Sequence, residues 1–350
     1  MSRGFEAVFG FPPQVRAQAP GRVNLLGEHT DYNDGFVLPT AIARTTTVQL
    51  GPSVDDNHHF YAARLDEYVS YAPGAPLPPG FARYVLGCLL LLQEQGYDSG
   101  PVALHVDSDV PIGAGLSSSA ALEIAVLRAL REWRALPLDD VDLARIAQQA
   151  EIRYAQVRCG IMDQMACSLA DSRHMLFLDT RSLERKLLPF PDGAEVLVID
   201  SGIPRSLAGT AYNQRRTECE QAAKLLGVPA LRDAPGLDAI ERLPAPLDRR
   251  ARHVYTENAR VLQAAGGLSA SQFGERMNAS HASLRDDFEV SVAGLDALVG
   301  LLQAHPAVYG ARLTGAGFGG ACVALVGAGT GAEVGRDVLR AYSGDGRVLV

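Results

Sequence analysis

The sequence has few of the features that mark secreted, zinc-binding or membrane-spanning proteins. Its five cysteines are odd in number and scattered, and none forms a C-x-x-C pair, which argues against a disulfide framework and against a zinc site. The longest apolar run, YVLGCLLLL at 84–92, is too short to cross a bilayer and is typical of a buried helix. Residues 1–20 lack the long apolar stretch of a secretory signal. We therefore expect a cytoplasmic protein whose thiols are reduced and mostly buried.

Basic residues are in the minority. The chain has 40 acidic and 32 basic side chains and a net charge of −8 at pH 7, whereas nucleic-acid backbones select a basic protein surface. This balance argues against nucleic acid as the main partner, and we expect no membrane partner either. It leaves a locally bound nucleotide open. A hydrophobic fraction of 47% and a mean hydropathy of +0.03 are typical of globular proteins.

The patterning predicts an α+β protein of two domains. Segments TTTVQL, VALHVDSDV, EVLVID and CVALVGA are rich in β-branched residues and predict strands, while helical periodicity fills much of the rest. A chain of 350 residues is long for one core. The strand near 195 follows the turn LPFPDGA, so we place the domains at 1–193 and 194–350.

Two common nucleotide-binding devices are missing. The sequence contains no G-x-x-x-x-G-K-[ST] loop and neither the H-R-D nor the D-F-G element of protein kinases. GAGFGG at 315–320 does satisfy G-x-G-x-x-G, but only residues 321–350 follow it, too few for a complete dinucleotide-binding domain. A tight turn between two strands is an alternative interpretation of this segment.

The segment DVPIGAGLSSSAALEIAVLRAL at 109–130 is a stronger candidate for a phosphate site. A strand-like stretch enters a glycine loop, and three serines lead into a helix with one apolar stripe. Glycines let the backbone approach an anion, and the start of a helix offers free N–H groups and a positive dipole end. A serine-capped helix is the alternative, but one serine suffices for a cap. The candidate phosphate ligands are Gly113, Gly115, Ser117, Ser118 and Ser119.

Two carboxylates lie in unusually apolar surroundings. The helix expected from Asp139 onward has an apolar stripe toward which Glu151 points, and a buried carboxylate needs a cation or hydrogen-bond donors. It is either an edge residue that reaches solvent or arginine, or a magnesium ligand. Asp163, in CGIMDQMA, is either a turn or cap aspartate or a partly desolvated carboxylate that meets a substrate hydroxyl.

Three segments resemble, in order, the motifs of the GHMP small-molecule kinases. They are GRVNLLGEHTDYNDG, PIGAGLSSSAA and RLTGAGFGGACVAL, and GEHTDYNDG within the first is similar to the galactokinase signature. Further similarity covers essentially the whole chain. The resemblance implies a two-domain fold with the active site in the cleft between the domains, and an enzyme that uses ATP to phosphorylate D-galactose at its anomeric hydroxyl.

The resemblance also implies roles for single residues. Arg22 and Asp163 would be the catalytic pair at the anomeric hydroxyl, with Asp163 acting as base or orienting group. A hexose exposes hydroxyls around its rim, which accounts for the many polar side chains at 19–39. The other sugar ligands would be Glu28, His29, Asp31 and Tyr212, although a first-turn aromatic packed on its own domain is an alternative for Tyr212. Ser119 and Glu151 would hold Mg²⁺ beside ATP.

Two rival functions remain. The chain could phosphorylate a related sugar, such as N-acetylgalactosamine or arabinose, although GEHTDYNDG favours plain galactose. It could also be a sensor that binds galactose and ATP without transfer. Sensors of this kind carry a deletion after the serine run, whereas GLSSSAALE is uninterrupted here. We expect D-galactose and ATP as partners, and a monomer or weak dimer.

Overall fold

The computed structural model describes residues 3–204 and 208–350, which divide into two compact units. Unit 1 comprises the chain up to Arg22 together with Ala41–Pro111 and Ser117–Leu169. Unit 2 comprises Val23–Thr40, Ile112–Leu116 and Ala170–Val350. This division differs from a simple boundary at 193/194, because residues 170–193 and two earlier segments lie in unit 2. The boundary at 193/194 stays a prediction.

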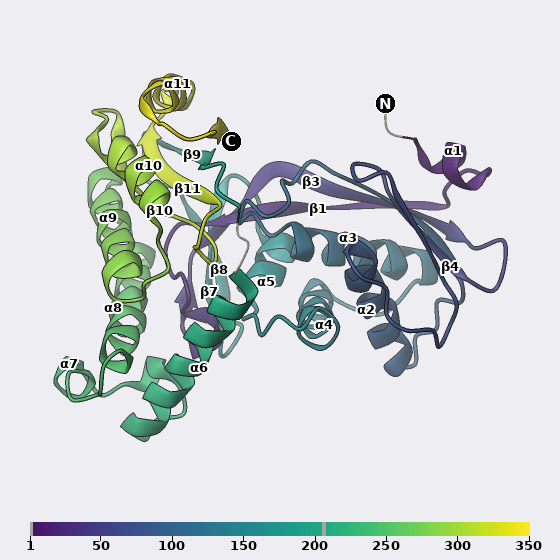
Figure 1. The fold of residues 1–350 in the computed structure, drawn as a ribbon, viewed down its shortest axis with the longest axis horizontal. Helices are drawn as coiled ribbons and strands as arrows, with labels where there is room; N and C mark the ends of the chain where they lie inside the picture. Colours follow the sequence, from purple (N-terminus) through teal and green to yellow (C-terminus); the bar gives the residue numbers. More distant parts are fainter. Residues whose placement is uncertain (1–2, 205–207) are drawn as a thin grey trace. The chain divides into compact units, whose positions relative to one another are not determined.

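Unit 1 is a five-stranded sheet in the order β1-β3-β6-β4-β5, with helices α2 to α5 against one face (Figure 1). Its strands are β1 (Val15–Asn24), β3 (Pro39–Pro52), β4 (His58–Ala62), β5 (Glu67–Tyr71) and β6 (Val102–Ser108). Its helices are α1 (Phe5–Phe9), α2 (Phe81–Glu94), α3 (Ser118–Arg134), α4 (Asp140–Arg153) and α5 (Met162–Leu169).

Local sequence explains where these helices form. The apolar run at 84–92 lies in α2, whose side chains are mostly buried. The acidic start expected for α4 is a capping box. The side chain of Asp139 accepts from the backbone N–H of Asp142, and the side chain of Asp142 accepts from the backbone N–H of Asp139. The apolar stripe of α4 is buried, and Glu151 is buried with it.

Unit 2 contains a four-stranded sheet in the order β10-β11-β9-β12 and a three-stranded sheet in the order β2-β7-β8. Its strands are β2 (Phe36–Val37), β7 (His174–Asp179), β8 (Arg185–Pro189), β9 (Ala194–Asp200), β10 (Val308–Leu313), β11 (Ala321–Gly327) and β12 (Arg347–Val348). Its helices are η1 (Asp31–Asn33), α6 (Ala208–Leu226), η2 (Leu231–Asp233), α7 (Leu237–Ile240), α8 (Leu247–Ala265), α9 (Ala270–Asp286), α10 (Ala293–Ala304) and α11 (Gly331–Ala341).

The helices α9 and α10 pack on β10, and α9 approaches the strand through a pair of glycines. A Cβ built on Gly274 of α9 would lie 2.1 Å from the carbonyl oxygen of Tyr309, and one on Gly310 of β10 would lie 2.1 Å from the carbonyl oxygen of Gly274. Glycine at both positions therefore lets the helix lie directly on the strand. The neighbouring core includes Phe288 and Leu313, both fully buried.

The structure confirms the α+β class and the four strands expected from the sequence, which lie in β3, β6, β9 and β11. GAGFGG lies in the connection between the antiparallel strands β10 and β11, as the turn interpretation expected. Within the described residues none of the five cysteines forms a disulfide, and four of them are buried while Cys159 is partly exposed. Within 3–204 and 208–350, no helix is long and apolar enough to cross a membrane.

A methyl group at Gly274 should disrupt the contact between α9 and β10. We expect Gly274→Ala to lower the free energy of unfolding by about 1–3 kcal/mol or more, because backbone must move to admit the Cβ. Gly300→Ala is the matched control: Gly300 is also helical, and a Cβ there would have no neighbour within 4 Å. The control should be neutral or stabilising by up to about 1 kcal/mol. Urea denaturation of both variants measures the difference, and equal effects would contradict this packing.

Candidate active site

In unit 1, the side chains of Arg22 and Ser117 hold the carboxylate of Asp163. Nε and Nη2 of Arg22 both donate to Oδ1 of Asp163, at 2.8 and 2.5 Å. The hydroxyl of Ser117 donates to Oδ2 at 2.6 Å. Arg22 is 4% exposed and Asp163 is 30% exposed, so the guanidinium is buried and the carboxylate keeps one accessible side. The predicted catalytic pair is therefore in direct contact.

Local backbone conformation places Ser117 for this contact. Ser117 precedes α3 and has φ 58°, the left-handed region that residues other than glycine rarely adopt. Its hydroxyl does not cap α3, as a plain helix start would require, and contacts Asp163 in the first turn of α5 instead. The strained backbone thus directs the serine toward the carboxylate.

The second carboxylate of unit 1, Glu151, contacts Ser119 and Gln164. The hydroxyl of Ser119 donates to Oε1 at 3.1 Å, and the amide of Gln164 donates to Oε2 at 2.8 Å. Burial, followed by the nearby charge of Asp163, raises the pKa of Glu151 to about 7, against the opposing effects of Ser119, Arg22 and Gln164. A buried carboxylate in this state gains from a cation placed beside it.

Glu123 of α3 is a second buried carboxylate of unit 1, close to Glu151. Neither carboxylate oxygen of Glu123 has a hydrogen-bond partner of normal geometry. The amide oxygen Oε1 of Gln164 also lacks such a partner. Burial and then the charge of Glu151 raise the pKa of Glu123 well above its usual range, although Gln164 opposes this. In the described part of the chain, no group of three or more His, Cys, Asp and Glu side chains could hold a metal ion. A carboxylate and a hydroxyl, as in Glu151 and Ser119, nevertheless fit a magnesium ion that takes its other ligands from phosphate and water.

In unit 2, the predicted sugar ligand Glu28 is buried beside two residues that sequence reasoning did not assign. Glu28 is 2% exposed and accepts a hydrogen bond from Nη2 of Arg312, which is fully buried. Nη1 of Arg312 also lies 3.6 Å from Oε1 of Glu257. Burial opposes ionisation of Glu257, but Arg260 and Arg312 outweigh it and lower its pKa to about 2. These four charged side chains are balanced in sign.

His29 has protein partners at both ring nitrogens. Nδ1 lies 2.8 Å from the hydroxyl of Tyr32, and Nε2 lies 3.2 Å from the carbonyl oxygen of Ala316. Since a carbonyl only accepts, Nε2 carries the proton and Nδ1 accepts from Tyr32. Burial, followed by the charge of nearby His253, lowers the pKa of His29 to about 3, so the ring is neutral near pH 7. The sugar-binding role of His29 stays a prediction. In the structure, His29 joins the polar loop, residues 25–35 between β1 and β2, to Ala316 of the third motif.

The other two predicted sugar ligands lie on different elements of unit 2. Asp31 begins η1, where Oδ1 accepts from the backbone N–H of Tyr32 at 3.0 Å. Tyr212 projects from α6 toward the same loop, with its ring centroid 5.5 Å from that of His29 and 5.4 Å from that of Tyr32. The aromatic packing expected as the alternative for Tyr212 is present, and it does not exclude a sugar contact.

Glycines bring the second and third motifs together at the backbone. Gly113, Gly115 and Gly315 have φ of 78°, 88° and 80°, all in the left-handed region that favours glycine. A Cβ on Gly315 would lie 3.0 Å from the carbonyl oxygen of Gly115, so a side chain there would crowd the neighbouring loop. Both segments belong to unit 2. Gly113 and Gly115 remain predicted phosphate ligands.

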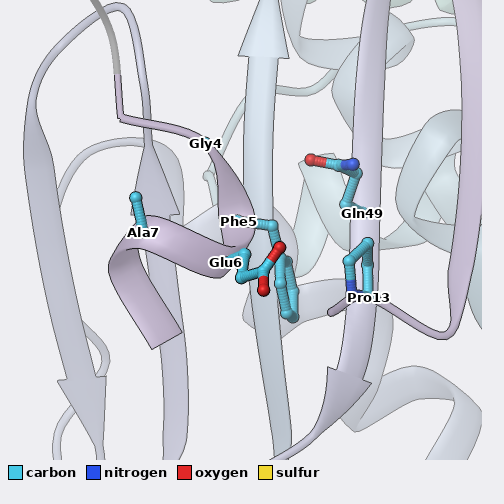
Figure 2. A pocket seen from close by; sticks show the side chains of 6 residues that line it. All are labelled: Gly4, Phe5, Glu6, Ala7, Pro13 and Gln49. Atoms are coloured by element: carbon cyan, nitrogen blue, oxygen red, sulfur yellow. The ribbon is translucent and has the colours of Figure 1, made fainter. Parts of the chain in front are cut away.

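A surface hollow in unit 1 contains none of the predicted site residues. Figure 2 shows its lining, in which the polar side chains are those of Glu6 and Gln49. The remaining lining residues are Gly4, Phe5, Ala7 and Pro13. A single carboxylate and one amide offer little for recognising a phosphate or a sugar. We therefore base the candidate site on the residues around Asp163 and Glu151 in unit 1 and on those around Glu28 in unit 2.

Sequence reasoning missed the residues that support the predicted ligands. Arg312 lies three positions before GAGFGG, and an arginine in an otherwise apolar strand is a signal of a buried charge. His253 and Glu257 lie in RRARHVYTEN on α8, where two polar side chains four positions apart share a helix face. Gln164 follows Asp163 directly. None of these signals names a partner, because the partners are far away in the sequence.

Comparison with known proteins identifies the family. A family model for the galactokinase galactose-binding signature matches residues 3–52, and models for the N-terminal and C-terminal domains of GHMP kinases match 83–171 and 262–344. A galactokinase from Roseiflexus sp. (strain RS-1) is 45% identical over 335 residues, 92% of this chain and 86% of that protein. The chain belongs to the galactokinase family. The expected family and its sugar kinase activity are thereby confirmed.

Solved structures agree with this membership. The crystal structure of Lactococcus lactis galactokinase complexed with galactose has a TM-score of 0.89 and 30% identity, and covers 98% of this chain and 95% of that chain. Mevalonate kinase from Methanococcus jannaschii, at 18% identity, covers 96% of each chain with a TM-score of 0.71. The second comparison shows the shared GHMP kinase fold, which is the fold expected from the motifs.

The buried histidine behind Glu28 predicts acid sensitivity. Nε2 of His253 donates to the backbone carbonyl of Glu28 at 3.0 Å, and Nδ1 lies 2.9 Å from the hydroxyl oxygen of Ser283. Burial lowers the pKa of His253 to about 4, although the charge of Glu257 opposes this. The folded state therefore binds fewer protons than the unfolded state below about pH 6.5, and stability falls as the pH falls toward 4.

We expect the wild type to lose about 2 kcal/mol more than His253→Gln between pH 6.5 and pH 5, since the variant has no imidazole at this position to protonate. Urea denaturation at several pH values measures both slopes. Parallel slopes for the two proteins would contradict the neutral, buried state of His253.

Proposed function

We propose that this member of the galactokinase family transfers the γ-phosphoryl group of ATP to the anomeric hydroxyl of D-galactose, giving galactose 1-phosphate and ADP. The observation that carries the proposal is the contact of Arg22 and Ser117 with Asp163. It presents a fixed, partly accessible carboxylate beside a buried guanidinium, as a transfer to a hydroxyl requires.

Asp163 accepts the hydrogen bond of the attacking hydroxyl and orients its oxygen toward the phosphorus. Phosphoryl transfer depends mainly on positioning and on electrostatic stabilisation, so a fixed acceptor accounts for much of its role. Arg22 adds a positive charge where negative charge gathers on the attacking and transferred oxygens. Ser117 keeps the second carboxylate oxygen in place.

Sugar recognition falls to the polar loop of unit 2. Glu28 and Asp31 supply acceptors for hydroxyls away from the reacting carbon, and Tyr212 supplies an aromatic face with a hydroxyl. His29 keeps the loop in shape through Tyr32 and the Ala316 carbonyl. A loop that fixes each acceptor discriminates between sugars that differ at one hydroxyl, because a missing hydroxyl leaves a buried acceptor unpaired.

Gly113, Gly115 and the serines at 117–119 bind the phosphates of ATP in this proposal. Ser119 and Glu151 would hold Mg²⁺, which neutralises phosphate charge when it is bound. Glu151 is suited to this role because its burial leaves it in need of a cation. That the enzyme works in the cytoplasm, as a monomer or weak dimer, stays a prediction.

The substitution Asp163→Asn tests the proposed transfer. We expect kcat on galactose to fall by about 10²-fold or more, because an amide presents a poorer acceptor and loses the pairing with Arg22. ADP release is measured with ATP and magnesium against galactose, N-acetylgalactosamine, arabinose and glucose. Asp56→Asn, at an exposed position, is the matched control and should keep wild-type rates.

Each outcome has a distinct meaning. Wild-type turnover that favours N-acetylgalactosamine or arabinose would replace galactose as the substrate. Binding of galactose without any transfer would support a sensor and overturn the proposed function. Full activity of Asp163→Asn on galactose would leave the reaction intact but remove Asp163 from its role.

Glu151→Gln tests the proposed magnesium ligand. The amide keeps the size of the side chain but loses its charge, so we expect the magnesium concentration for half-maximal rate to rise at least tenfold while the KM for galactose changes little. Magnesium titrations at saturating ATP and galactose measure this. Glu132→Gln, on the exposed face of α3, serves as control. An unchanged magnesium requirement in Glu151→Gln would contradict the assignment.

A further inference from the structure

We propose that Arg312 is a positioning residue for Glu28, and that recognition of one hydroxyl of the sugar depends on their buried contact. Arg312 lies at the end of β10, and Glu28 lies in the polar loop 284 positions earlier in the chain. The inference rests on the proposed function, because Glu28 acts there as a sugar ligand. It adds a residue that touches no substrate group and still sets specificity.

The guanidinium of Arg312 contacts the polar loop at two points. Nη2 donates to Oε2 of Glu28, and Nη1 donates to the carbonyl oxygen of Leu25 at 3.2 Å. Nε donates to the carbonyl oxygen of Leu313 at 2.8 Å, which fixes the plane of the guanidinium. Both Arg312 and Glu28 are almost completely removed from solvent. One planar group therefore orients the side chain of Glu28 and the backbone before it.

Glu257 completes the support from the other side of the loop. Its Oε1 accepts from the backbone N–H of Gly27 at 2.8 Å and from the hydroxyl of Ser280 at 2.7 Å, and its Oε2 accepts from Arg260 at 2.6 Å. Glu257 thus has donors besides Arg312. Removing the contact between Arg312 and Glu28 would leave Glu257 satisfied, so the effect of a substitution should be concentrated at Glu28.

The backbone of Glu28 is also held, which makes its side chain the variable part. His253 donates to the carbonyl oxygen of Glu28 at 3.0 Å, and the preceding N–H of Gly27 is bound by Glu257. With the main chain fixed on both sides, the guanidinium of Arg312 acts on the direction of the carboxylate itself. Lysine retains the charge at this position but cannot present the same planar set of donors.

Rigid placement matters because a site rejects a deoxy sugar only if its acceptor cannot adjust. A fixed, buried carboxylate that loses the hydrogen bond of a sugar hydroxyl cannot turn to replace it, which is costly. A carboxylate freed from Arg312 can turn toward water or another donor. Arg312→Lys should therefore weaken discrimination at the hydroxyl that Glu28 contacts, and leave the other positions as they are.

The experiment compares wild type, Glu28→Gln and Arg312→Lys on galactose and on its 2-, 3-, 4- and 6-deoxy forms. For each protein, the penalty of a deoxy sugar is the factor by which its kcat/KM falls below that of galactose. The hydroxyl that Glu28 contacts is the one whose removal carries a smaller penalty in Glu28→Gln than in the wild type. We expect Arg312→Lys to shrink the penalty at the same position by about tenfold or more in kcat/KM. The KM for galactose should rise, and the KM for ATP should stay within about twofold.

Arg260→Lys is the matched control, since Arg260 contacts Glu257 and is also a partly buried partner of the same cluster. It should lower thermal stability without changing the pattern across the deoxy sugars. If Arg312→Lys does not fold, the double variant Glu28→Gln/Arg312→Gln removes both charges of the pair. That variant should show the deoxy-sugar pattern of Glu28→Gln alone.

The outcomes separate this inference from the proposed function. A wild type that does not phosphorylate galactose overturns both. A wild type that does, combined with an Arg312→Lys variant that loses rate equally on every sugar or at a different hydroxyl from Glu28→Gln, overturns only the role of Arg312. The same holds if the double variant is altered at a further position.

Discussion

A buried guanidinium needs a carboxylate beside it, and Arg22 and Asp163 meet this need for each other. Arg22 lies at the end of the unit 1 part of β1 and Asp163 in the first turn of α5, so their contact ties the sheet to the helices below it. The same contact fixes the direction of the Asp163 carboxylate, which stays partly exposed to solvent. Structure and chemistry in unit 1 thus depend on one ion pair.

Unit 2 also contains buried ion pairs between arginine and glutamate, and these are less exposed than the pair of unit 1. Arg312 and Arg260 balance Glu28 and Glu257, while His253 and His29 stay neutral and act through hydrogen bonds. Breaking a buried pair leaves a charge without a partner, which costs more than the pair contributes. A loop with many polar side chains is stable here because its neighbours satisfy them, and its remaining hydrogen-bonding capacity can serve a sugar.

Sequence patterns predicted what local chemistry determines. The capped start of α4 and the direction of Glu151 toward the buried stripe of that helix follow from periodicity and spacing, and the motifs identified the family. The phosphate-binding role of the glycines and serines at 113–119 stays a prediction. Contacts between distant segments could not be predicted in this way. Arg22 and Asp163 are separated by 141 positions, and Arg312 and Glu28 by 284. Family resemblance supplied the first pair, but no pattern in the sequence indicated that Arg312 and Glu28 meet.

The side-chain directions of Ser117 and His29 were equally hidden. A serine before a helix usually caps it, whereas the left-handed backbone at Ser117 turns its hydroxyl toward Asp163. His29 is still predicted to bind the sugar, but no sequence pattern indicated that its ring nitrogens also contact Tyr32 and the carbonyl of Ala316. Both differences arise because the final hydrogen bonds depend on neighbours that only the folded chain brings together.

The most direct test of the account is the identity of the product. Galactose labelled with ¹³C at the anomeric carbon is incubated with the protein, ATP and magnesium, and the products are followed by ¹³C and ³¹P NMR. The account predicts a labelled carbon that acquires a coupling to phosphorus as ADP accumulates. A phosphate attached at any other carbon, or ADP released without sugar phosphate, would contradict it.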